Sequence, residues 1–257
     1  MARRSLLTAK TRQELFGIPE DPKQLARFYT LSREDHGLIR TRRRDENRLG
    51  LAIHIALLRH PGQGWIDGVA LPEPFIMWLT EQLVMPNINL AEYARRRKTK
   101  SAHHQIAMSH LGLHPFQALH LDTATLLARE AAFATDHGLE IMNALCTGLR
   151  EQRLVLPSSD TLERLALKGR AAARRQAAAS IFEALSADHR AALQNLLTND
   201  PEVGQSRLAW LRGYPHSTNP ASMHALLARI RYLRELNLPA DLGRDIHPAR
   251  LTKFARE

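Results

Sequence analysis

Apolar residues recur at three- and four-residue spacing along most of this chain, which is the pattern of helices that bury one face. The spacing of Leu49, Ala52, Ile53, Ala56 and Leu57 predicts a helix with one buried stripe. The alternation of apolar and polar residues that marks a half-buried strand persists nowhere in the sequence. The sequence therefore predicts an all-α fold.

A second pronounced stripe lies near the end of the sequence. In a long helix predicted to start at Ser222, the residues expected in the core are Leu226, Leu227, Ile230, Leu233 and Leu236. Arginines between them, which should face outward or pair with Glu235, are Arg229, Arg231 and Arg234. A shorter helix beginning at Asp188 is expected to bury Leu193, Leu196 and Leu197.

Residues 31–62 contain two helix-sized blocks joined by a basic corner. Ser32 with Asp35 resembles a capping box, and Asp45 is expected to cap the second helix. Polar residues on the other sides of the second helix, able to reach base edges, are Asn47, Arg48 and His54. Two helices with a tight basic corner favour a helix-turn-helix, the arrangement of many DNA readers.

Capping residues divide the rest of the chain into further helices. The expected starts are Thr8, Asp21, Pro72 with Pro74, Thr99 or Ser101, Asp122, Leu139, one of Ser158 to Asp160, and Ser206. The helix from Asp122 should end near His137, and residues 154–157 should form an extended connector. Residues 117–120 are expected to form a domain boundary. The chain is therefore predicted to contain two tandem helix-turn-helix-like modules, 1–118 and 119–257.

The net charge of the chain adds a further prediction, that the partner of this helical protein is a polyanion. The 257 residues carry a formal net charge of +10, and their apolar share of 44% is enough for a core. Two stretches lack acids altogether: 94–120, which begins with the basic run 95–100, and 165–181. A helix N-terminus beside such a run is well suited to phosphate.

Several classes of protein are disfavoured. The single cysteine, Cys146, lies in an apolar helical stretch and is expected to be a buried thiol, which excludes a disulfide framework within the chain. No glycine-rich phosphate loop or metalloprotease motif is present, and adjacent His103 and His104 do not share a helix face. With no secretory signal and no apolar run of membrane-spanning length, we expect a protein of the reducing cytoplasm.

The sequence also resembles a known family, the N-terminal region of the Tn-three-family transposases of class II, replicative transposons. Residues that carry the resemblance in the first half are Tyr29, Leu31, Ser32, Asp35, Ile39, Arg43, Asn47, Arg48, Leu49, Gly50, Ala52, Leu58, Arg59, Pro61, Gly62, Tyr93, Arg97, Thr99, His103, Ile106, Leu111, Gly112 and Phe116. Those in the second half are Leu149, Arg150, Leu156, Pro157, Leu162, Glu163, Arg164, Leu208, Trp210, Leu211, Arg212, His247, Pro248, Arg250, Leu251, Ala255 and Arg256. Ala102, Met108 and Ser109 depart from the family pattern.

The resemblance implies a role in DNA transposition. Such enzymes break and join DNA with metal-bound carboxylates on an RNase H-like core that lies C-terminal to the region matched here. We therefore expect this chain to keep DNA recognition, to lack catalysis and to need no cofactor. The parent is expected to be a DDE-type DNA transposase that uses a divalent metal, Mg²⁺, in its missing catalytic domain and self-associates through its missing parts.

The partner expected for this chain is the double-stranded terminal inverted repeat of a transposon. Candidate DNA-binding residues are Arg42, Arg43, Arg44, Asn47, Arg48, Arg95, Arg96, Arg97, Lys98, Lys100, His103, Ser159, Thr161, Arg164, Lys168, Arg170, Arg174 and Arg175. Arg forks onto guanine and Asn onto adenine, so the first module should read bases with Arg43, Arg44, Asn47 and Arg48. In the second module the readers should be Ser159, Thr161, Arg164 and Lys168, while residues 95–100 clamp the backbone.

Two other readings stay open from sequence. One is a helical adaptor or assembly module that anchors acidic protein surfaces through Trp65 and the Trp210 segment. The other is a nucleic-acid binder without sequence preference.

Overall fold

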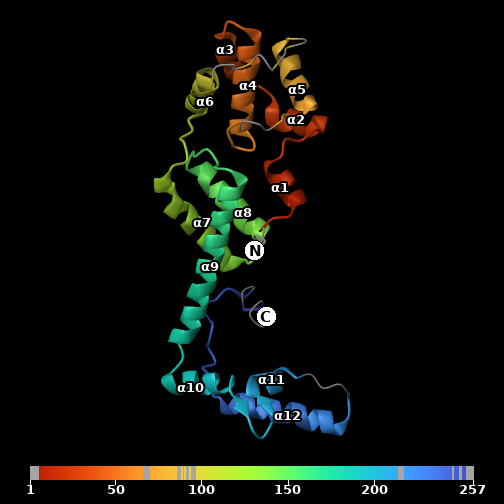
Figure 1. Cartoon of the computed structure of the whole chain (residues 1–257), viewed down its shortest axis with the longest axis vertical. Coiled ribbons are helices and arrows are strands. Elements are labelled where there is room, and N and C mark those ends of the chain that lie inside the picture. The colour runs from red at the N-terminus through yellow and green to blue at the C-terminus, as the bar shows by residue number, and fades with distance from the viewer. Residues whose placement is uncertain are drawn as a thin grey trace. The chain divides into compact units, whose positions relative to one another are not determined.

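The computed structural model describes residues 6–65, 70–85, 88, 90, 93, 97–213, 217–244, 246–248 and 251–252. These residues are mostly helical (Figure 1), which confirms the all-α class. Their two strands, β1 (Asn199–Asp200) and β2 (Gln205–Ser206), form a short antiparallel pair. Of the described helices, none is long and apolar enough to cross a membrane.

The chain divides into two compact units, Met1–Ala171 (unit one) and Ala172–Glu257 (unit two). Helices of unit one are α1 (Ala9–Phe16), α2 (Pro22–Tyr29), α3 (Arg33–Arg40), α4 (Asp45–Arg59), α5 (Glu73–Leu83), α6 (Arg97–Leu111), the 3₁₀ turn η2 (Ala118–His120), α7 (Leu121–Ala134) and α8 (Gly138–Glu151). Helix α9 (Ser159–Glu183) begins in unit one and continues into unit two.

Local capping follows the sequence closely at several helix starts. The side chains of Thr8, Asp21 and Ser32 accept hydrogen bonds from backbone amides in the first turns of α1, α2 and α3. Ser206 does the same for α11 (Arg207–Arg212). Each bond satisfies an amide that has no partner within its helix, so the start is fixed by residues next to it in sequence.

Other predicted starts are wrong. Asp45 is the first residue of α4 rather than its cap, and its carboxylate pairs with Arg48 Nη1 at 2.9 Å. Helix α6 begins at Arg97, before either predicted cap, so Thr99 and Ser101 lie inside its first turns. Helix α7 continues from η2, which places Asp122 within its first turn.

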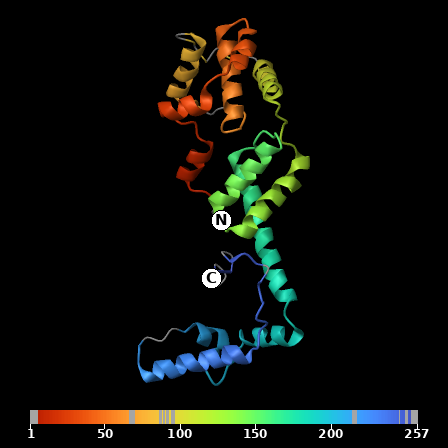
Figure 2. The ribbon, with the colours of Figure 1, turned by 180° about the vertical axis from the view of Figure 1, so that it is seen from behind.

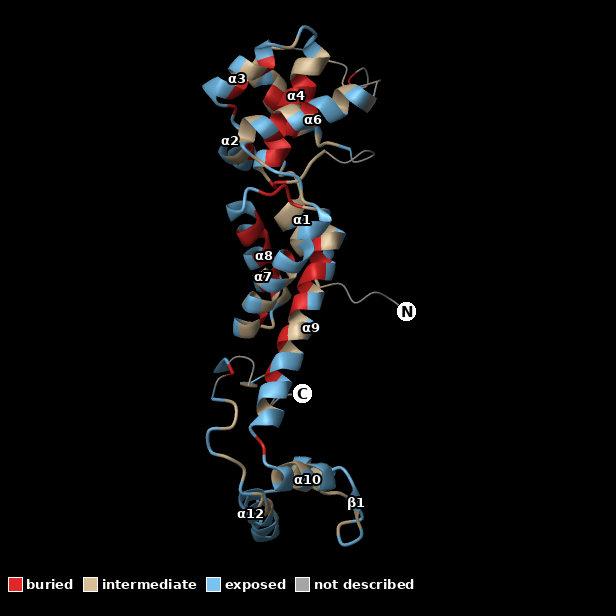
Figure 3. Cartoon of the chain, turned by 90° about the vertical axis from the view of Figure 1, so that its left-hand side faces the viewer, coloured by how far each residue is buried: buried red, intermediate tan, exposed pale blue. Residues whose placement is uncertain are grey.

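Helix α4 is the centre of unit one and is buried on every side. All residues from Leu49 to Leu58 are buried, including His54, so the predicted single buried stripe is wrong (Figure 3). The surrounding helices cover it with Leu25 and Tyr29 from α2, Ile39 from α3, Phe75 and Leu79 from α5, and Ala107 and Met108 from α6. Each of the leucine, isoleucine, phenylalanine and methionine side chains among them contributes roughly 1.5–3 kcal/mol on burial. This burial leaves only the first turn of α4 for contact with a ligand.

One buried carboxylate joins three of these helices. Asp35 on α3 has no exposed surface and accepts bonds from the Ser32 amide (2.7 Å), from His110 Nε2 on α6 (2.8 Å) and from Arg59 Nη2 on α4 (2.9 Å to each oxygen). Burial alone would raise the pKa of Asp35. The bonds from Ser32, His110 and Arg59 outweigh burial and lower that pKa below its usual value.

The second group of helices is tied to the first within unit one. The extended connector 154–157 bonds to two loops, through Val155 N to His114 O at 2.9 Å and Leu156 N to Gly62 O at 2.8 Å. Arg12 on α1 donates to Asp160 (2.8 Å) and to Glu163 (2.7 Å) on α9. Because of these ties the compact units do not divide at 118/119, and the two modules stay a prediction about function.

Unit two contains α10 (Ala187–Asn195), the β1–β2 pair, α11 and α12 (Pro220–Glu235). Arg207 organises it, with ion pairs to Asp200 and Glu202 and with its guanidinium over the rings of Trp210 and Tyr232. Helix α10 is capped by Ser186, two residues before the predicted start, and α12 by Asn219, three residues before it.

The predicted core of α12 is wrong in the structure. Leu226, Leu227, Ile230 and Leu233 are 39–49% exposed. The side of α12 that packs within unit two carries Arg229 and Tyr232 against Trp210 instead. Leu197, predicted to be buried, is likewise 67% exposed.

Replacing Asp35 tests the junction of α3, α4 and α6. We expect Asp35→Ala to lower the free energy of unfolding by about 3 kcal/mol, because Arg59 and His110 lose their buried partner. Urea denaturation of the full chain measures the change. Glu34→Ala, an exposed acid in the same turn, is the control and should cost less than about 1 kcal/mol.

The same carboxylate predicts a pH dependence. Its folded pKa lies below that of an unfolded aspartate, about 3.9, so its contribution to stability is full above that value and is lost as pH falls through the folded pKa. The stability difference between wild type and Asp35→Ala should therefore shrink below about pH 4. A difference that stays constant into that range would contradict the assignment.

Candidate nucleic-acid interface

Helices α4 and α6 pack side by side and run in the same direction (Figures 1 and 2). Near their starts, Tyr93, which precedes α6, lies against Gly50 of α4; near their ends, Arg59 and His110 meet on Asp35. Their two N-termini therefore lie at the same end of unit one. Each N-terminus carries the positive end of a helix dipole, and each is preceded by or contains a basic run.

The corner between α3 and α4 is braced by Arg48. Its Nε donates to the carbonyl of Arg42 at 2.8 Å, and its Nη1 bonds to Asp45 at 2.9 Å. The guanidinium of Arg42 in turn donates to Thr41 Oγ1. Arg42 and Arg48 thus hold the corner, and Arg43, Arg44 and Asn47 are the predicted residues left with their side chains at its surface.

These three side chains differ in their exposure and in whether they form ion pairs. Arg43 is exposed and makes no ion pair with any described residue, whereas Arg44 Nη1 lies 3.8 Å from Glu46. Asn47 is half-buried in the first turn of α4. Asp45 and Glu46 reduce the positive potential at this helix end, so its net attraction for phosphate depends on the arginines and on α6.

The start of α6 supplies the second basic group. Lys98 is exposed, and Lys100 Nζ lies 4.3 Å from the centre of the Trp65 ring. Trp65 stacks on Tyr93 with the planes 2° apart, so an aromatic pair supports this helix end. Arg95 and Arg96 lie outside the described residues, and of Arg97 only the backbone, the first residue of α6, is described.

His103, a candidate from sequence, is directed inward. It is 4% exposed, and its Nδ1 lies 2.9 Å from the hydroxyl of Tyr93. Burial, and secondly the charge of Arg42, lowers the pKa of His103, so its ring is neutral at pH 7 and offers no charge to a phosphate. We therefore remove His103 from the set of contacting residues and assign it to the packing of α6.

The basic residues of α9 divide between faces of that helix. Buried positions such as Leu162, Ala166 and Ala173 pack it inward. Exposed basic residues recur at helical spacing on the opposite side as Arg164, Lys168 and Arg175. Arg164 Nη2 donates to Thr161 Oγ1 at 3.1 Å. The other predicted residues of this helix, which are half-buried, are Ser159, Arg170 and Arg174.

We call Arg43, Arg44, Asn47 and Lys98 the corner surface, and Arg164 and Lys168 the α9 surface; Arg175, farther along α9, belongs to unit two. Arginine forks and lysine point charges are the groups that bind phosphate, and both surfaces lie at or on exposed helices. Three further polar residues near the corner were not proposed as contacts from sequence. Arg40 is exposed at the end of α3, and Ser101 and Gln105 are exposed on the side of α6 opposite Ala107. The four-residue spacing of Ser101 and Gln105 was the available signal.

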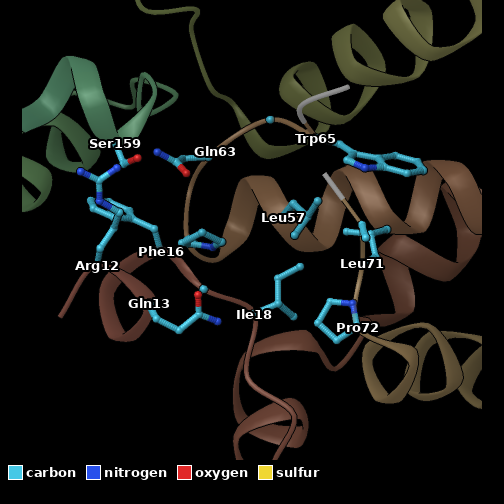
Figure 4. Close-up of a pocket in the computed structure, with 14 residues that line it drawn as sticks. Arg12, Gln13, Phe16, Ile18, Leu57, Gln63, Trp65, Leu71, Pro72 and Ser159 are labelled. Carbon is cyan, nitrogen blue, oxygen red and sulfur yellow. The ribbon is translucent and has the colours of Figure 1, made fainter. Parts of the chain in front are cut away.

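The described residues give little support for a small-molecule site or a metal site. A cavity of about 310 Å³ lies between α1, the loop 61–65 and the start of α5 (Figure 4). Of its polar lining groups, Arg12 is bonded to Asp160 and Glu163, and Gln63 Nε2 to the carbonyl of Pro157 at 2.7 Å. No cluster of three His, Cys, Asp or Glu that would hold a metal occurs among the residues described.

Cys146 is 4% exposed, as predicted. Burial raises the pKa of its thiol to about 11. The thiolate that acts as a nucleophile is therefore scarce at neutral pH, which fits a packing role for this residue.

Gly50 tests the contact that fixes the start of α6. A Cβ at this position would lie 2.0 Å from the Tyr93 ring, so Gly50→Ala should displace Tyr93 and lower the free energy of unfolding by roughly 1–3 kcal/mol. Gly37→Ala in α3 is the matched control, because its Cβ meets nothing within 4 Å, and it should be neutral or stabilising by up to about 1 kcal/mol. Chemical denaturation compares the two; equal effects would contradict the close approach.

Comparisons with known proteins show which family the chain is similar to. Residues 6–169 match the family described as "Domain of unknown function (DUF4158)". The chain is 35% identical over 257 residues to the transposase for transposon Tn501 of Pseudomonas aeruginosa and 34% identical over 258 to that for Tn3926 of Escherichia coli, in both cases over 100% of this chain. It is 26% identical over 255 residues, 98% of this chain, to the transposase for transposon Tn1546 of Enterococcus faecium.

The chain spans about a quarter, 26%, of the length of each of these relatives. The matched region is the N-terminal one. The chain therefore belongs to the DUF4158 family, and over its whole length it is similar to the N-terminal region of Tn-three-family transposases.

Proposed function

We propose that this chain binds the terminal inverted repeats of a transposon, as the DNA-recognition part of a transposase. The observation that carries the proposal is the parallel packing of α4 and α6, which gathers the exposed cations Arg43 and Lys98 at two helix N-termini. The net charge of +10 and the names of the relatives support a DNA partner.

Phosphate contacts supply affinity in this proposal and base contacts supply selectivity. Lys98, the amides at the start of α6 and the run at 95–97 neutralise the DNA backbone. Arg43, Arg44 and Asn47 reach base edges from the corner, since α4 beyond its first turn is buried and does not enter a groove. Arg48 contributes indirectly by bracing the corner.

The α9 surface binds a second stretch of the same DNA. Arg164 and Lys168 lie on unit one with the corner surface, so engagement of one surface raises the effective concentration of the other. Thr161 positions the guanidinium of Arg164, and Arg170 and Arg174 extend the positive potential along the helix. Each surface alone therefore binds weakly.

Strand cleavage and joining belong, in this proposal, to other parts of the parent transposase. A DDE-type carboxylate site with bound Mg²⁺ is assigned to those parts. The role of the present chain is to select and hold the transposon end.

The contacts of two tryptophans weaken the alternative hypothesis, that the chain is a helical adaptor for acidic protein surfaces. Trp65 stacks on Tyr93 beneath Lys100, and Trp210 packs against Tyr232 between two arginines. Both indoles are thus engaged within the fold, which weakens their case as anchors for a partner protein.

Removing phosphate contacts gives the first test of the proposal. We expect Lys98→Ala and Lys168→Ala each to weaken binding equally to an inverted-repeat duplex and to a shuffled duplex, and each to reduce the slope of log affinity against log salt by about one. Fluorescence anisotropy across a salt series measures both quantities. Arg33→Ala, an exposed cation at the opposite end of α3, is the control and should leave the slope unchanged.

Removing a base contact should act differently. We expect Asn47→Ala to reduce the preference for the inverted repeat over the shuffled duplex by about 1–3 kcal/mol, with little change in salt slope. A wild-type chain that binds both duplexes equally would identify a nonspecific binder. A chain that binds neither at low salt would refute DNA recognition altogether.

A further inference from the structure

Helix α12 in unit two turns its apolar side outward. Met223, Leu226, Leu227, Ile230 and Leu233 are 59%, 40%, 41%, 39% and 49% exposed. We call them the α12 seam; four of them, Met223, Leu226, Ile230 and Leu233, follow the three-four-three spacing of one helix face. A row of large apolar side chains at this spacing is the pattern by which one helix packs along another.

The opposite side of α12 is already used within unit two. Arg229 lies 5.7 Å from the centre of the Trp210 ring, and Tyr232 meets Trp210 edge-on at 5.8 Å. The helix therefore has no freedom to rotate its seam inward without losing these contacts. The seam is therefore a solvent-exposed surface of unit two and does not belong to its core.

The charges along the seam's borders identify what would cover it. Arg231 and Arg234 are exposed beside Leu227 and Ile230, Arg229 is turned away toward Trp210, and the helix carries one acid, Glu235, away from the seam. A second copy of α12 would bring a further pair of these arginines to the same interface without adding an acid beside the seam, and like charges across an interface oppose association. An amphipathic helix with acidic residues beside its apolar row would complement both features.

We propose that the α12 seam docks an amphipathic helix whose borders are acidic. This surface belongs to unit two alone, and the inference holds whether or not unit one binds DNA. It gives the chain a protein-binding surface in addition to its proposed DNA contacts.

The probe is a fluorescent three-heptad peptide with leucine at the a and d positions and glutamate at e and g, compared with a twin that has lysine at e and g. Anisotropy with the full chain should show binding of the glutamate peptide and at least a tenfold weaker response to the lysine peptide. Ile230→Gln should abolish binding, while Met77→Gln, a similarly exposed apolar residue on α5, should leave it unchanged.

Reversing the charges beside the seam distinguishes specific docking from nonspecific hydrophobic binding. Arg231→Glu combined with Arg234→Glu should shift the preference to the lysine peptide, an outcome that misfolding would not produce. Equal binding of the two peptides, or none of the glutamate peptide, would overturn the proposal. Concentration-dependent dimerisation of the wild-type chain in sedimentation, lost in Ile230→Gln, would assign the seam to a second copy and also overturn it.

Discussion

The arrangement of α3, α4 and α6 depends on one fully buried carboxylate, Asp35. Asp35 closes the capping box of α3 and accepts hydrogen bonds from the last residue of α4 and from His110 near the end of α6. A carboxylate without exposed surface is tolerated because every oxygen has donors, which also lowers its pKa. Because one group holds the ends of both helices, α4 and α6 are kept parallel, with their N-termini together.

The functional consequence lies at the other end of the same helices. Tyr93 fits against Gly50, stacks on Trp65 and bonds to His103, so aromatic packing fixes the start of α6 as Asp35 fixes its end. Arg48 braces the neighbouring corner. Rigid support of this kind leaves a few side chains, Arg43 and Lys98 foremost, exposed in defined positions. In our account, selection of a DNA end comes from this supported corner and from the exposed side of α9.

Sequence predicted what depends on near neighbours in the chain. The caps at Thr8, Asp21, Ser32 and Ser206 were correct because a side chain and an amide three residues away determine each one. The all-α class followed from periodicity, and the family followed from the order of matched residues.

Features that depend on distant segments were missed. Periodicity indicated one buried stripe on α4 but not the four helices that cover it, so His54 was taken for a surface residue. The same reasoning placed the apolar row of α12 in a core, although Trp210 covers the other side of that helix. His103 was a candidate DNA-binding residue from sequence, but its ring is buried and bonded to the Tyr93 hydroxyl. Likewise, no local pattern connects Arg12 with Asp160 and Glu163, which lie far along the chain.

Lysine footprinting tests the central claim most directly, because the chain offers matched probes. Acetylation of the full chain, read by mass spectrometry with and without an inverted-repeat duplex, reports each exposed ammonium separately. Our account predicts that DNA protects Lys98 and Lys168 and leaves Lys10 and Lys23, exposed on α1 and α2, as reactive as before. Protection of Lys10 and Lys23 with Lys98 and Lys168 unchanged, or no protection anywhere, would contradict it.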